Sequence, residues 1–330
     1  FARAGHDVVL IDGWPANVDA INRDGLTLSG MTETECFNAP ARALHITDVQ
    51  SLTRTGPIDI AFVTMKSFDT GWATLLIKEH LAADGFVVSL QNCINEETIA
   101  GIVGWGRVVG CIAAKIAVEL TGPATVRRGV ALGGDKHTVF RVGEPHGRIT
   151  PRIEKVRDLL ADIDSAKTTT NLWGERWSKL CANAMGNGTS AASGLGSNGC
   201  ARDPDLRWLM IRIAGEAAEI GRSHGYALEK IGKFEAADWI AAWRGDAAIR
   251  KTIEDDMLAA CEGRSEDNRP SMGQDISKGR RTEIDFINGF VADKGAEIGI
   301  DAPANRGLVK AVTAVERGEL APSPERLRGI

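Results

Sequence analysis

The sequence lacks the features that mark membrane, nucleic-acid-binding and secreted proteins. No apolar run approaches the roughly 20 residues that a membrane span needs. The formal net charge is −5, whereas a general nucleic-acid binder needs clustered Lys and Arg for its phosphate contacts. No secretory h-region, no repeat of solenoid length and no low-complexity tract is visible. We therefore expect a globular protein whose partner is a small molecule, not a membrane or a nucleic acid.

Paired cysteines are missing as well. None of the six cysteines forms a C-x-x-C motif or lies at zinc-ligand spacing from a histidine: Cys36, Cys93, Cys111, Cys181, Cys200 and Cys261. Scattered thiols in a chain of this length are typical of buried, inert cysteines in a reducing compartment. The sequence thus predicts a cytoplasmic protein without a metal site.

The first 115 residues instead contain an alternation of short apolar runs and helix-compatible segments. The apolar runs are "DVVLID" (7–12), "IDIAFVTM" (58–65), "GFVVSLQN" (85–92) and "RVVGCIAA" (107–114). Continuous apolar strands separated by helices indicate a parallel sheet covered on both faces. We predict an α/β fold with a doubly wound, Rossmann-type domain at the N-terminal side.

The rest of the chain changes character twice. Residues 116–149 contain short β-prone pieces broken by Gly and Pro, which we expect to add antiparallel strands to the same sheet. Thr150 and Pro151 predict a helix start, and from about residue 172 the pattern is almost all helical, with a last long helix over roughly 272–298. We predict a dinucleotide-binding domain over 1–165, an all-helical substrate-binding and catalytic domain over 166–330, and a ligand site in the cleft between them.

The opening residues, "FARAGHDVVLID" (1–12), are typical of a helix end, a glycine stop and a buried strand. A dinucleotide fingerprint places its acidic residue about 20 positions after its first glycine, so with Asp12 in that role the first strand and the glycine loop lie upstream of Phe1. A carboxylate there accepts hydrogen bonds from the adenosine ribose and repels a 2′-phosphate, which favours NAD(H). The alternative is an ordinary core strand that ends in a solvated Asp12.

A polar stripe occupies "LWGERWSKLCANAMGNGTSAASGL" (172–195). Lys179, Asn183 and Asn187 recur every four residues and so share one face of a helix. Such groups are costly to bury unless they bind something polar, and a ligand carboxylate or hydroxyl would satisfy them. The alternative is an exposed stripe, which the flanking Trp173 and Trp177 disfavour.

A second constellation lies in "EDNRPSMGQDISKGRRTEIDFINGF" (266–290). Asn268 and Ser271 flank Pro270 at a helix start, and Glu283 follows further along. On one straight helix Ser271 and Glu283 would be about 18 Å apart, too far to touch one small substrate. We therefore expect the helix to begin near Gly273, with Ser271 on a loop that folds over the cleft.

These segments resemble the ketopantoate reductase (2-dehydropantoate 2-reductase) family of the 6-phosphogluconate-dehydrogenase-like superfamily. The resemblance covers essentially the whole chain, and its most specific segments are "LWGERWSKLCANAMGN" and "PSMGQDISKGRRTEIDFINGF". It implies an NADP(H)-dependent oxidoreductase that reduces the C2 carbonyl of a 2-oxo acid, ketopantoate, in pantothenate biosynthesis. It also implies a homodimer.

The resemblance assigns the catalytic roles to two residues. A lysine like Lys179 is the general acid that protonates the carbonyl oxygen, on which negative charge develops during hydride transfer. The acid that matches Glu283 hydrogen-bonds this lysine and favours its charged form.

The resemblance also assigns binding roles. Residues that match Asn183 and Asn187 hold substrate hydroxyls, and those that match Asn268 and Ser271 engage the carboxylate end of the substrate. Two further positions lie beside the cofactor and are matched by Lys66 in "VTMKSFDT" and Asn92 in "SLQNCINEE".

Three departures from the family pattern leave alternatives open. The family commonly has Gly where this chain has Cys93 and Pro where it has Gly188, and its NADPH-dependent members usually carry an Arg near Gly13. These differences motivate an alternative, namely a paralogue that reduces another 2-oxo acid or oxidises a 2-hydroxy acid. An alternative from another class is a cofactor-binding sensor without turnover, which would have no use for an acid at Lys179.

Overall fold

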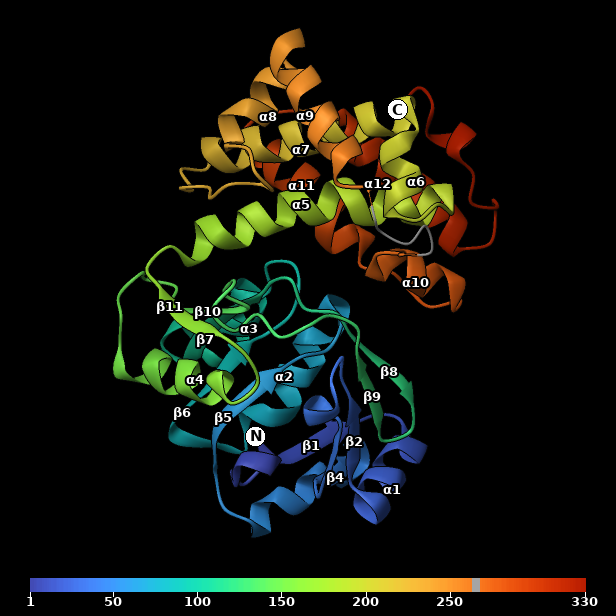
Figure 1. Cartoon of the computed structure of the whole chain (residues 1–330). Helices are drawn as coiled ribbons and strands as arrows, with labels where there is room; N and C mark the ends of the chain where they lie inside the picture. The colour runs from blue at the N-terminus through green and yellow to red at the C-terminus, as the bar shows by residue number, and fades with distance from the viewer. Residues whose placement is uncertain (263–267) are drawn as a thin grey trace. The chain divides into compact units, whose positions relative to one another are not determined.

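The structure is a computed structural model that describes residues 1–262 and 268–330. It consists of two compact units, Phe1–Leu172 and Trp173–Ile330 (Figure 1). The sequence analysis places the domain boundary at 165. Strand β11 (Ala166–Thr169) pairs with β10 (Phe140–Gly143), so the residues just after 165 add a strand to the first unit.

The main sheet of the first unit has five strands in the order β11-β10-β7-β6-β5. Strands β5 (Ile58–Val63), β6 (Leu81–Ser89) and β7 (Val108–Ala113) are parallel, whereas β10 runs antiparallel to β7. Helices α2 (Thr70–Lys78) and α3 (Glu96–Val103) connect the parallel strands, and α4 (Pro151–Ala161) connects β10 with β11. The predicted doubly wound parallel sheet is confirmed.

The side chains of β6 alternate between the two faces of the sheet, and each face is covered by a helix. Phe86 and Val88 pack in one core cluster with Ile153 of α4, while Val87 packs in another with Ile99 of α3. Successive side chains of a strand point to opposite faces, so a strand that is apolar at every position needs a cover on each side.

Strands β1 (Val9–Asp12) and β4 (Arg42–His45) form a separate parallel pair. Their apolar side chains reach the core cluster beneath β5, around Val49, Leu52 and Ile77. Among the described residues, β1 and β5 each have one edge without a strand partner. The strand and glycine loop predicted upstream of Phe1 remain a prediction.

Residues 116–149 do not all extend the main sheet, so that expectation is correct only for β10. Strands β8 (Val118–Gly122) and β9 (Thr125–Arg128) join β2 (Leu26–Ser29) and β3 (Phe37–Ala39) in a four-stranded sheet of order β3-β2-β9-β8. The parallel pairing of β9 with β2, which follows α1 (Pro15–Asp24), joins segments far apart in the chain. Local sequence patterns carry no signal for such a pairing.

The second unit is all-helical in its described part, as predicted. Its elements are α5 (Leu172–Ser193), α6 (Ser197–Arg202), α7 (Pro204–Ser223), α8 (Ala236–Trp243), α9 (Ala247–Ala259), α10 (Ser271–Ser277), the π-helix η6 (Asp285–Gly289), α11 (Phe290–Glu297) and α12 (Pro303–Glu316). The start predicted for α7 is confirmed, because the Asp203 side chain accepts hydrogen bonds from the amides of Asp205 and Leu206. The two longest helices are α5 and α7, and α7 packs against α6, α8, α11 and α12 (Figure 1).

The single long helix predicted over 272–298 is wrong. Helix α10 ends at Ser277, and Gly279 follows with a left-handed φ of 62°. Helical structure resumes only at Ile284, directly before η6. Ser271 is the first residue of α10 and does not lie on a preceding loop, which is a second correction.

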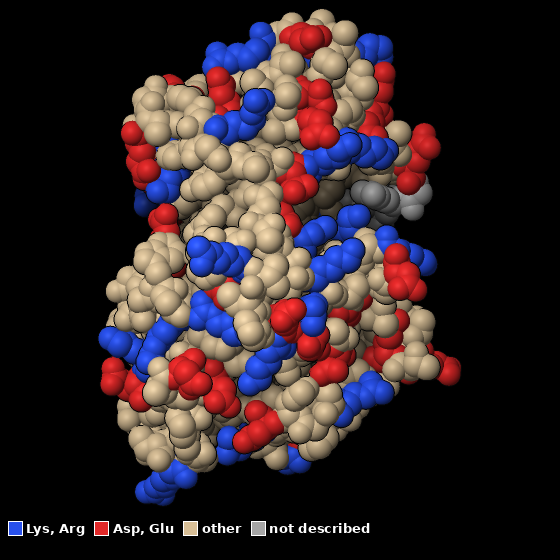
Figure 2. All heavy atoms as spheres, turned by 90° about the vertical axis from the view of Figure 1, so that its left-hand side faces the viewer, with Lys and Arg blue, Asp and Glu red and all other residues tan. Residues whose placement is uncertain are grey.

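Charges of both signs alternate over the face shown in Figure 2, and they form no single basic patch there. No helix in the described ranges 1–262 and 268–330 is long and apolar enough to cross a membrane. The same residues contain no group of three or more His, Cys, Asp and Glu side chains placed to hold a metal ion.

A buried ion pair fastens the loop between β9 and β10. The Arg128 guanidinium contacts the Asp164 carboxylate, and their side chains are 5% and 1% exposed. Burial acts to raise the pKa of Asp164, but hydrogen bonds from the amides of Gly133 and Ser165 and from Arg128 hold it below its usual value. The folded state therefore favours the charged form of this carboxylate.

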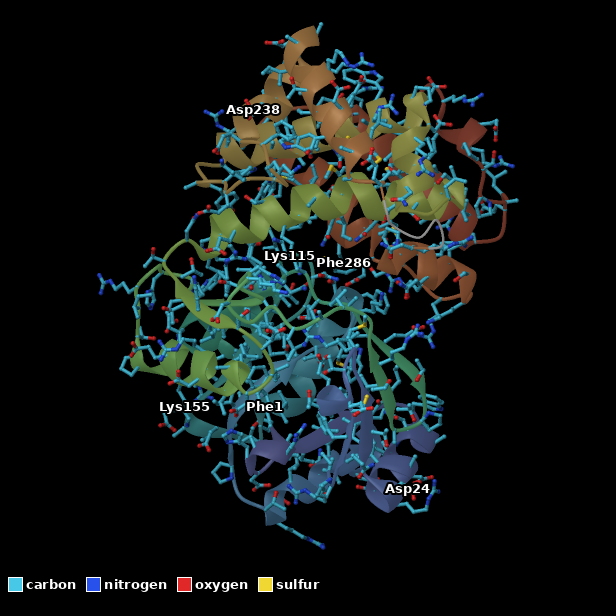
Figure 3. The ribbon with its side chains drawn as sticks, in the orientation of Figure 1. Phe1, Asp24, Lys115, Lys155, Asp238 and Phe286 are labelled. Atoms are coloured by element: carbon cyan, nitrogen blue, oxygen red, sulfur yellow. The ribbon has the colours of Figure 1, made fainter. Side chains whose placement is uncertain are left out.

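We predict that Asp164→Ala destabilises the chain by about 3–5 kcal/mol, because it leaves Arg128 buried without a counter-charge. Since the folded-state pKa of Asp164 is lowered, its contribution is complete above the unfolded pKa and is lost as the pH falls through the folded value. Urea unfolding over a pH series measures this. The matched control is Asp24→Asn, at the residue labelled near the edge of Figure 3, which removes the exposed pair with Arg23 and should change nothing measurable. Equal losses for the two variants would contradict the prediction.

Candidate active site

Helix α5 carries the predicted polar stripe opposite its buried face. Trp177 and Cys181 are fully buried, and the Trp177 indole donates a 2.7 Å hydrogen bond to the carbonyl of Ala217 in α7. At 3.6 residues per turn, Lys179, Asn183 and Asn187 lie on the other side of the helix. Lys179 and Asn183 are partly buried and Asn187 is 9% exposed. The second unit thus brings these three predicted residues together on one face.

Asn183 has an amide group whose donor is not used. Its Nδ2 atom is buried and has no hydrogen-bond partner among the described residues. A buried donor left in this state costs about 1–3 kcal/mol, which a bound acceptor such as a substrate oxygen would recover. The unused donor supports a ligand site on the polar face of α5.

Ser271 is the first residue of α10. A Cβ atom on Gly273 would come within 2.9 Å of the Ser190 Oγ, so α10 packs closely on α5 one turn beyond Asn187. The carbonyl of Asn268 accepts a 3.0 Å hydrogen bond from the amide of Ser197 at the start of α6. The Asn268 and Ser271 side chains are both exposed.

Glu283 is 5% exposed and lies just before η6. On one side of it, Thr282 donates hydrogen bonds of 2.8 and 2.6 Å, from its amide and its hydroxyl, to Glu316 of α12. On the other side, Ile284 reaches α5, where a Cβ on Gly188 would lie 3.2 Å from the Ile284 side chain and 2.7 Å from Leu308. Glu283 is therefore anchored beside the turn that carries Asn187. Its predicted hydrogen bond with Lys179 stays a prediction.

In the first unit, Lys66 and Asn92 follow the carboxyl ends of the adjacent parallel strands β5 and β6. Two hydrogen bonds join the two loops. The side-chain amide of Gln91 donates a 2.8 Å hydrogen bond to the carbonyl of Met65, and the side-chain amide of Asn95 donates a 3.2 Å hydrogen bond to the Ser67 hydroxyl. The structure thus brings the two predicted cofactor residues to one edge of the sheet, where ligands of open α/β sheets bind.

Cys93, directly after Asn92, has a φ of 65°, and its side chain is 5% exposed. This is the left-handed region, which a side chain other than glycine enters at a cost of about 1–3 kcal/mol. Lys115, after the carboxyl end of β7, also has a positive φ, of 56° (Figure 3). Strained residues at neighbouring strand ends are typical of functional loops.

Asp12 ends β1 and is partly buried. Its two carboxylate oxygens accept hydrogen bonds from the amide of Trp14 at 2.8 Å and from the Asn17 side chain at 2.7 Å. A carboxylate has about four acceptor positions, so capacity remains for a ribose diol. Among the described residues Asp12 forms no ion pair with Lys or Arg. These three residues fit a nicotinamide dinucleotide. Asp12 would hold its adenosine ribose, and Lys66 and Asn92 would contact the part of the cofactor that lies at the ends of β5 and β6.

The sequence analysis missed a buried polar cluster in the second unit. Glu216 of α7 is 1% exposed and accepts hydrogen bonds from the amides of Ala304 and Asn305 at the start of α12. Burial raises the pKa of Glu216, against the effect of these hydrogen bonds. The sequence feature that indicates this cluster is Glu216 itself, because it lies within the apolar stripe of α7, where an apolar residue is expected.

The break after α10 was also missed. Its signal is the Gly279 that follows Lys278, since a basic last turn followed by glycine is an ordinary helix stop.

Comparison with known proteins agrees with this geometry. The family model "Ketopantoate reductase PanE/ApbA" matches residues 1–139, and "Ketopantoate reductase PanE/ApbA C terminal" matches residues 171–316. The 2-dehydropantoate 2-reductase of Archaeoglobus fulgidus is 30% identical over 326 residues, which covers 96% of this chain and 92% of that protein. The enzyme of the same name from Pyrococcus horikoshii is also 30% identical, with 96% and 91% covered. The chain belongs to the ketopantoate reductase family.

Solved structures show the same fold. A PanE/ApbA family ketopantoate reductase from Ralstonia eutropha superposes with a TM-score of 0.76 at 27% identity, covering 96% of this chain and 93% of that one. A D-mandelate dehydrogenase, solved with NADH and anilino(oxo)acetate, superposes with a TM-score of 0.75 at 19% identity and the same coverage. At that identity the likeness concerns the fold alone.

We predict that Asn183→Ala leaves the melting temperature unchanged or raises it, because it removes a buried donor that has no partner. The same change should raise the KM for the 2-oxo acid by about tenfold, the loss of one hydrogen bond to substrate. Calorimetry and steady-state kinetics measure the two effects.

The control is Asn17→Ala in the first unit. Asn17 is 4% exposed, and both ends of its side-chain amide are paired, with Asp12 at 2.7 Å and with the backbone amide of Ala124 at 2.8 Å. It should lose stability. An equal loss of melting temperature in both variants would mean that Asn183 has a purely structural role.

Proposed function

We propose that this chain is a 2-dehydropantoate 2-reductase, which reduces the C2 carbonyl of ketopantoate to the hydroxyl of pantoate. The observation that carries the proposal is the polar face of α5, where Lys179, Asn183 and Asn187 line up and the Asn183 donor has no partner among the described residues. Family membership and relatives of that name over nearly the whole chain support it.

Lys179 is the proton donor of the proposed reaction. Negative charge develops on the carbonyl oxygen as the C2 carbon becomes tetrahedral, and an ammonium group directed at that oxygen stabilises the charge. The proton then passes from Lys179 to the oxygen, which becomes the product hydroxyl, and solvent reprotonates the lysine. Glu283, buried beside the same helix, favours the charged form of the lysine that this step consumes.

The remaining polar groups orient the substrate. Asn183 and Asn187 offer both donors and acceptors to its hydroxyl and carbonyl groups. Ser271, on the helix that packs against α5 through Gly273, offers a hydroxyl to the carboxylate end of the substrate, together with Asn268. Holding the substrate at both ends removes the rotational freedom that the reacting geometry does not allow.

When bound, the nicotinamide cofactor supplies the hydride that reaches C2. The chain's own contribution is to hold it at the carboxyl ends of the first unit's strands, through Lys66, Asn92 and Asp12. The family resemblance favours NADP(H). Asp12 favours NAD(H), because its carboxylate repels a 2′-phosphate and Gly13 follows it where an arginine would bind that group.

A second candidate function is the reduction of another 2-oxo acid, or oxidation of the corresponding 2-hydroxy acid. The specific observation in its favour is Cys93, whose buried side chain and left-handed backbone lie beside Asn92 where the family commonly has glycine. Such a change at a cofactor loop can alter which cofactor and substrate fit together.

We further propose that the enzyme is cytoplasmic and forms a homodimer, as the family resemblance implies. The six cysteines are free thiols, and five of them are buried, as a reducing compartment allows. Sedimentation velocity at micromolar concentration should show a dimer, and a stable monomer would contradict this expectation.

The decisive test is a kinetic panel of ketopantoate and other 2-oxo acids, each with NADH and with NADPH. We expect the highest kcat/KM for ketopantoate and, if Asp12 sets the preference, a lower KM for NADH than for NADPH. A higher kcat/KM for another 2-oxo acid would favour the second candidate function. Cofactor binding without turnover on any 2-oxo acid would contradict both.

The variant that belongs to this panel is Lys179→Ala. Loss of a general acid lowers kcat by about 10²–10⁴-fold. The matched control is Lys310→Ala on α12, an exposed lysine of the same unit without a hydrogen bond or ion pair among the described residues, which should keep full activity. Turnover that survives the loss of Lys179 would exclude the mechanism.

A further inference from the structure

Asn288 is a fully buried asparagine in the π-helix η6, at 0% exposure. Its Nδ2 atom donates two hydrogen bonds, one of 3.1 Å to the carbonyl of Ala184 in α5 and one of 2.9 Å to the Oδ1 of Asn305 in α12. Both amide protons are therefore used, and the two acceptors fix which way the side chain is turned.

The Oδ1 atom of Asn288 is buried and has no hydrogen-bond partner among the described residues. A buried acceptor in this state lowers stability. The contribution of Asn288 therefore lies in the two hydrogen bonds that its Nδ2 atom donates, which join η6 to α5 and to α12.

The partner of Asn288 in α12 is itself held firmly. Asn305 is fully buried, and its Nδ2 atom donates to Glu216 at 2.9 Å and to the carbonyl of Ile213 at 3.3 Å, both in α7. Asn288 is thus the link between a rigid buried cluster and α5. Because Asn305 is held in a closely packed core, the hydrogen bond from Asn288 to Asn305 fixes where η6 lies relative to α12.

The α5 end of the link lies at the polar face. Ala184 directly follows Asn183, and its carbonyl belongs to the helical turn between Asn183 and Asn187. The π-helix η6 starts two residues after Glu283. The preceding residue, Thr282, is hydrogen-bonded to Glu316 of α12 and so anchors this segment to α12. π-Helical turns are rare and occur mostly at functional sites.

We propose that Asn288 is a positioning residue of the reductase: it fixes the register of η6 against α5 and so sets where Glu283 stands relative to Lys179 and Asn183. The proposal rests on the proposed function. It assigns Asn288 no contact with substrate, and it predicts an effect on the proton-donating step rather than on cofactor binding.

The test variant is Asn288→Leu, which removes both donated hydrogen bonds, with Asn288→Ser as the conservative partner that keeps one donor. We expect kcat to fall by about tenfold or more in the leucine variant, since small misplacements of catalytic groups have effects of this size. The pH profile of kcat should shift, because Glu283 no longer favours the charged lysine to the same degree. The KM for the cofactor should stay unchanged, and the serine variant should lie between.

The matched control is Ile253→Ala in α9, a fully buried side chain of the same unit on a helix that packs mainly on α8 and α6. It should keep both kcat and the pH profile at a temperature where the chain is folded. A leucine variant with unchanged kcat and pH profile would overturn the proposal, and so would an equal shift of the profile in Ile253→Ala.

A second measurement does not depend on turnover. Hydrogen exchange of the amides from Asn183 to Gly188 and from Phe286 to Gly289 should accelerate about tenfold in Asn288→Leu, because the link between the segments is lost, and not in Ile253→Ala. Unchanged exchange there would overturn the proposal even with an inactive wild type. If the wild type reduces no 2-oxo acid but exchange responds as expected, the proposed function fails and the positioning of η6 by Asn288 stands.

Discussion

The helical unit depends on one constraint: α5 must be buried on one side and polar on the other. The buried side is fixed by Trp177, whose indole has its only donor satisfied by the Ala217 carbonyl of α7. That contact sets the rotation of α5 about its own axis. Because a helix turns by a constant angle per residue, the same rotation determines the direction in which Lys179, Asn183 and Asn187 point. The chemistry proposed here is therefore a consequence of packing on the opposite face.

In the segments around α5, glycine permits a close approach between helices. Gly188 admits Leu308 and Ile284, and Gly273 admits the Ser190 hydroxyl. The loop after β6 in the first unit shows the opposite case, in which a residue other than glycine occupies a position that suits glycine. There Cys93 occupies a backbone conformation that suits glycine, and the loops on both sides of it are held by hydrogen bonds from Gln91 and Asn95.

Local patterns predicted much of this arrangement, and their failures have physical reasons. The apolar runs gave the parallel strands, and four-residue spacing gave the polar face of α5, because both depend only on the geometry of one element. The separate sheet of β8 and β9 depends on pairing with β2, which leaves no local signal. The helix over 272–298 was wrong because apolar spacing continues in phase across the break, while Gly279 carries the stop. The cluster of Glu216, Asn288 and Asn305 joins three elements and is visible only in the folded chain.

Two buried carboxylates give the two units opposite responses to acid. Asp164, with its pKa lowered, stabilises the first unit only while it is ionised, so this contribution disappears as protons are added. Glu216, with its pKa raised by burial, binds a proton more readily in the folded state than in the unfolded one, so acid strengthens the second unit at this site. Protonation of these two carboxylates therefore changes the stability of the two units in opposite directions, and the loss in the first unit begins only below the unfolded pKa of an aspartate.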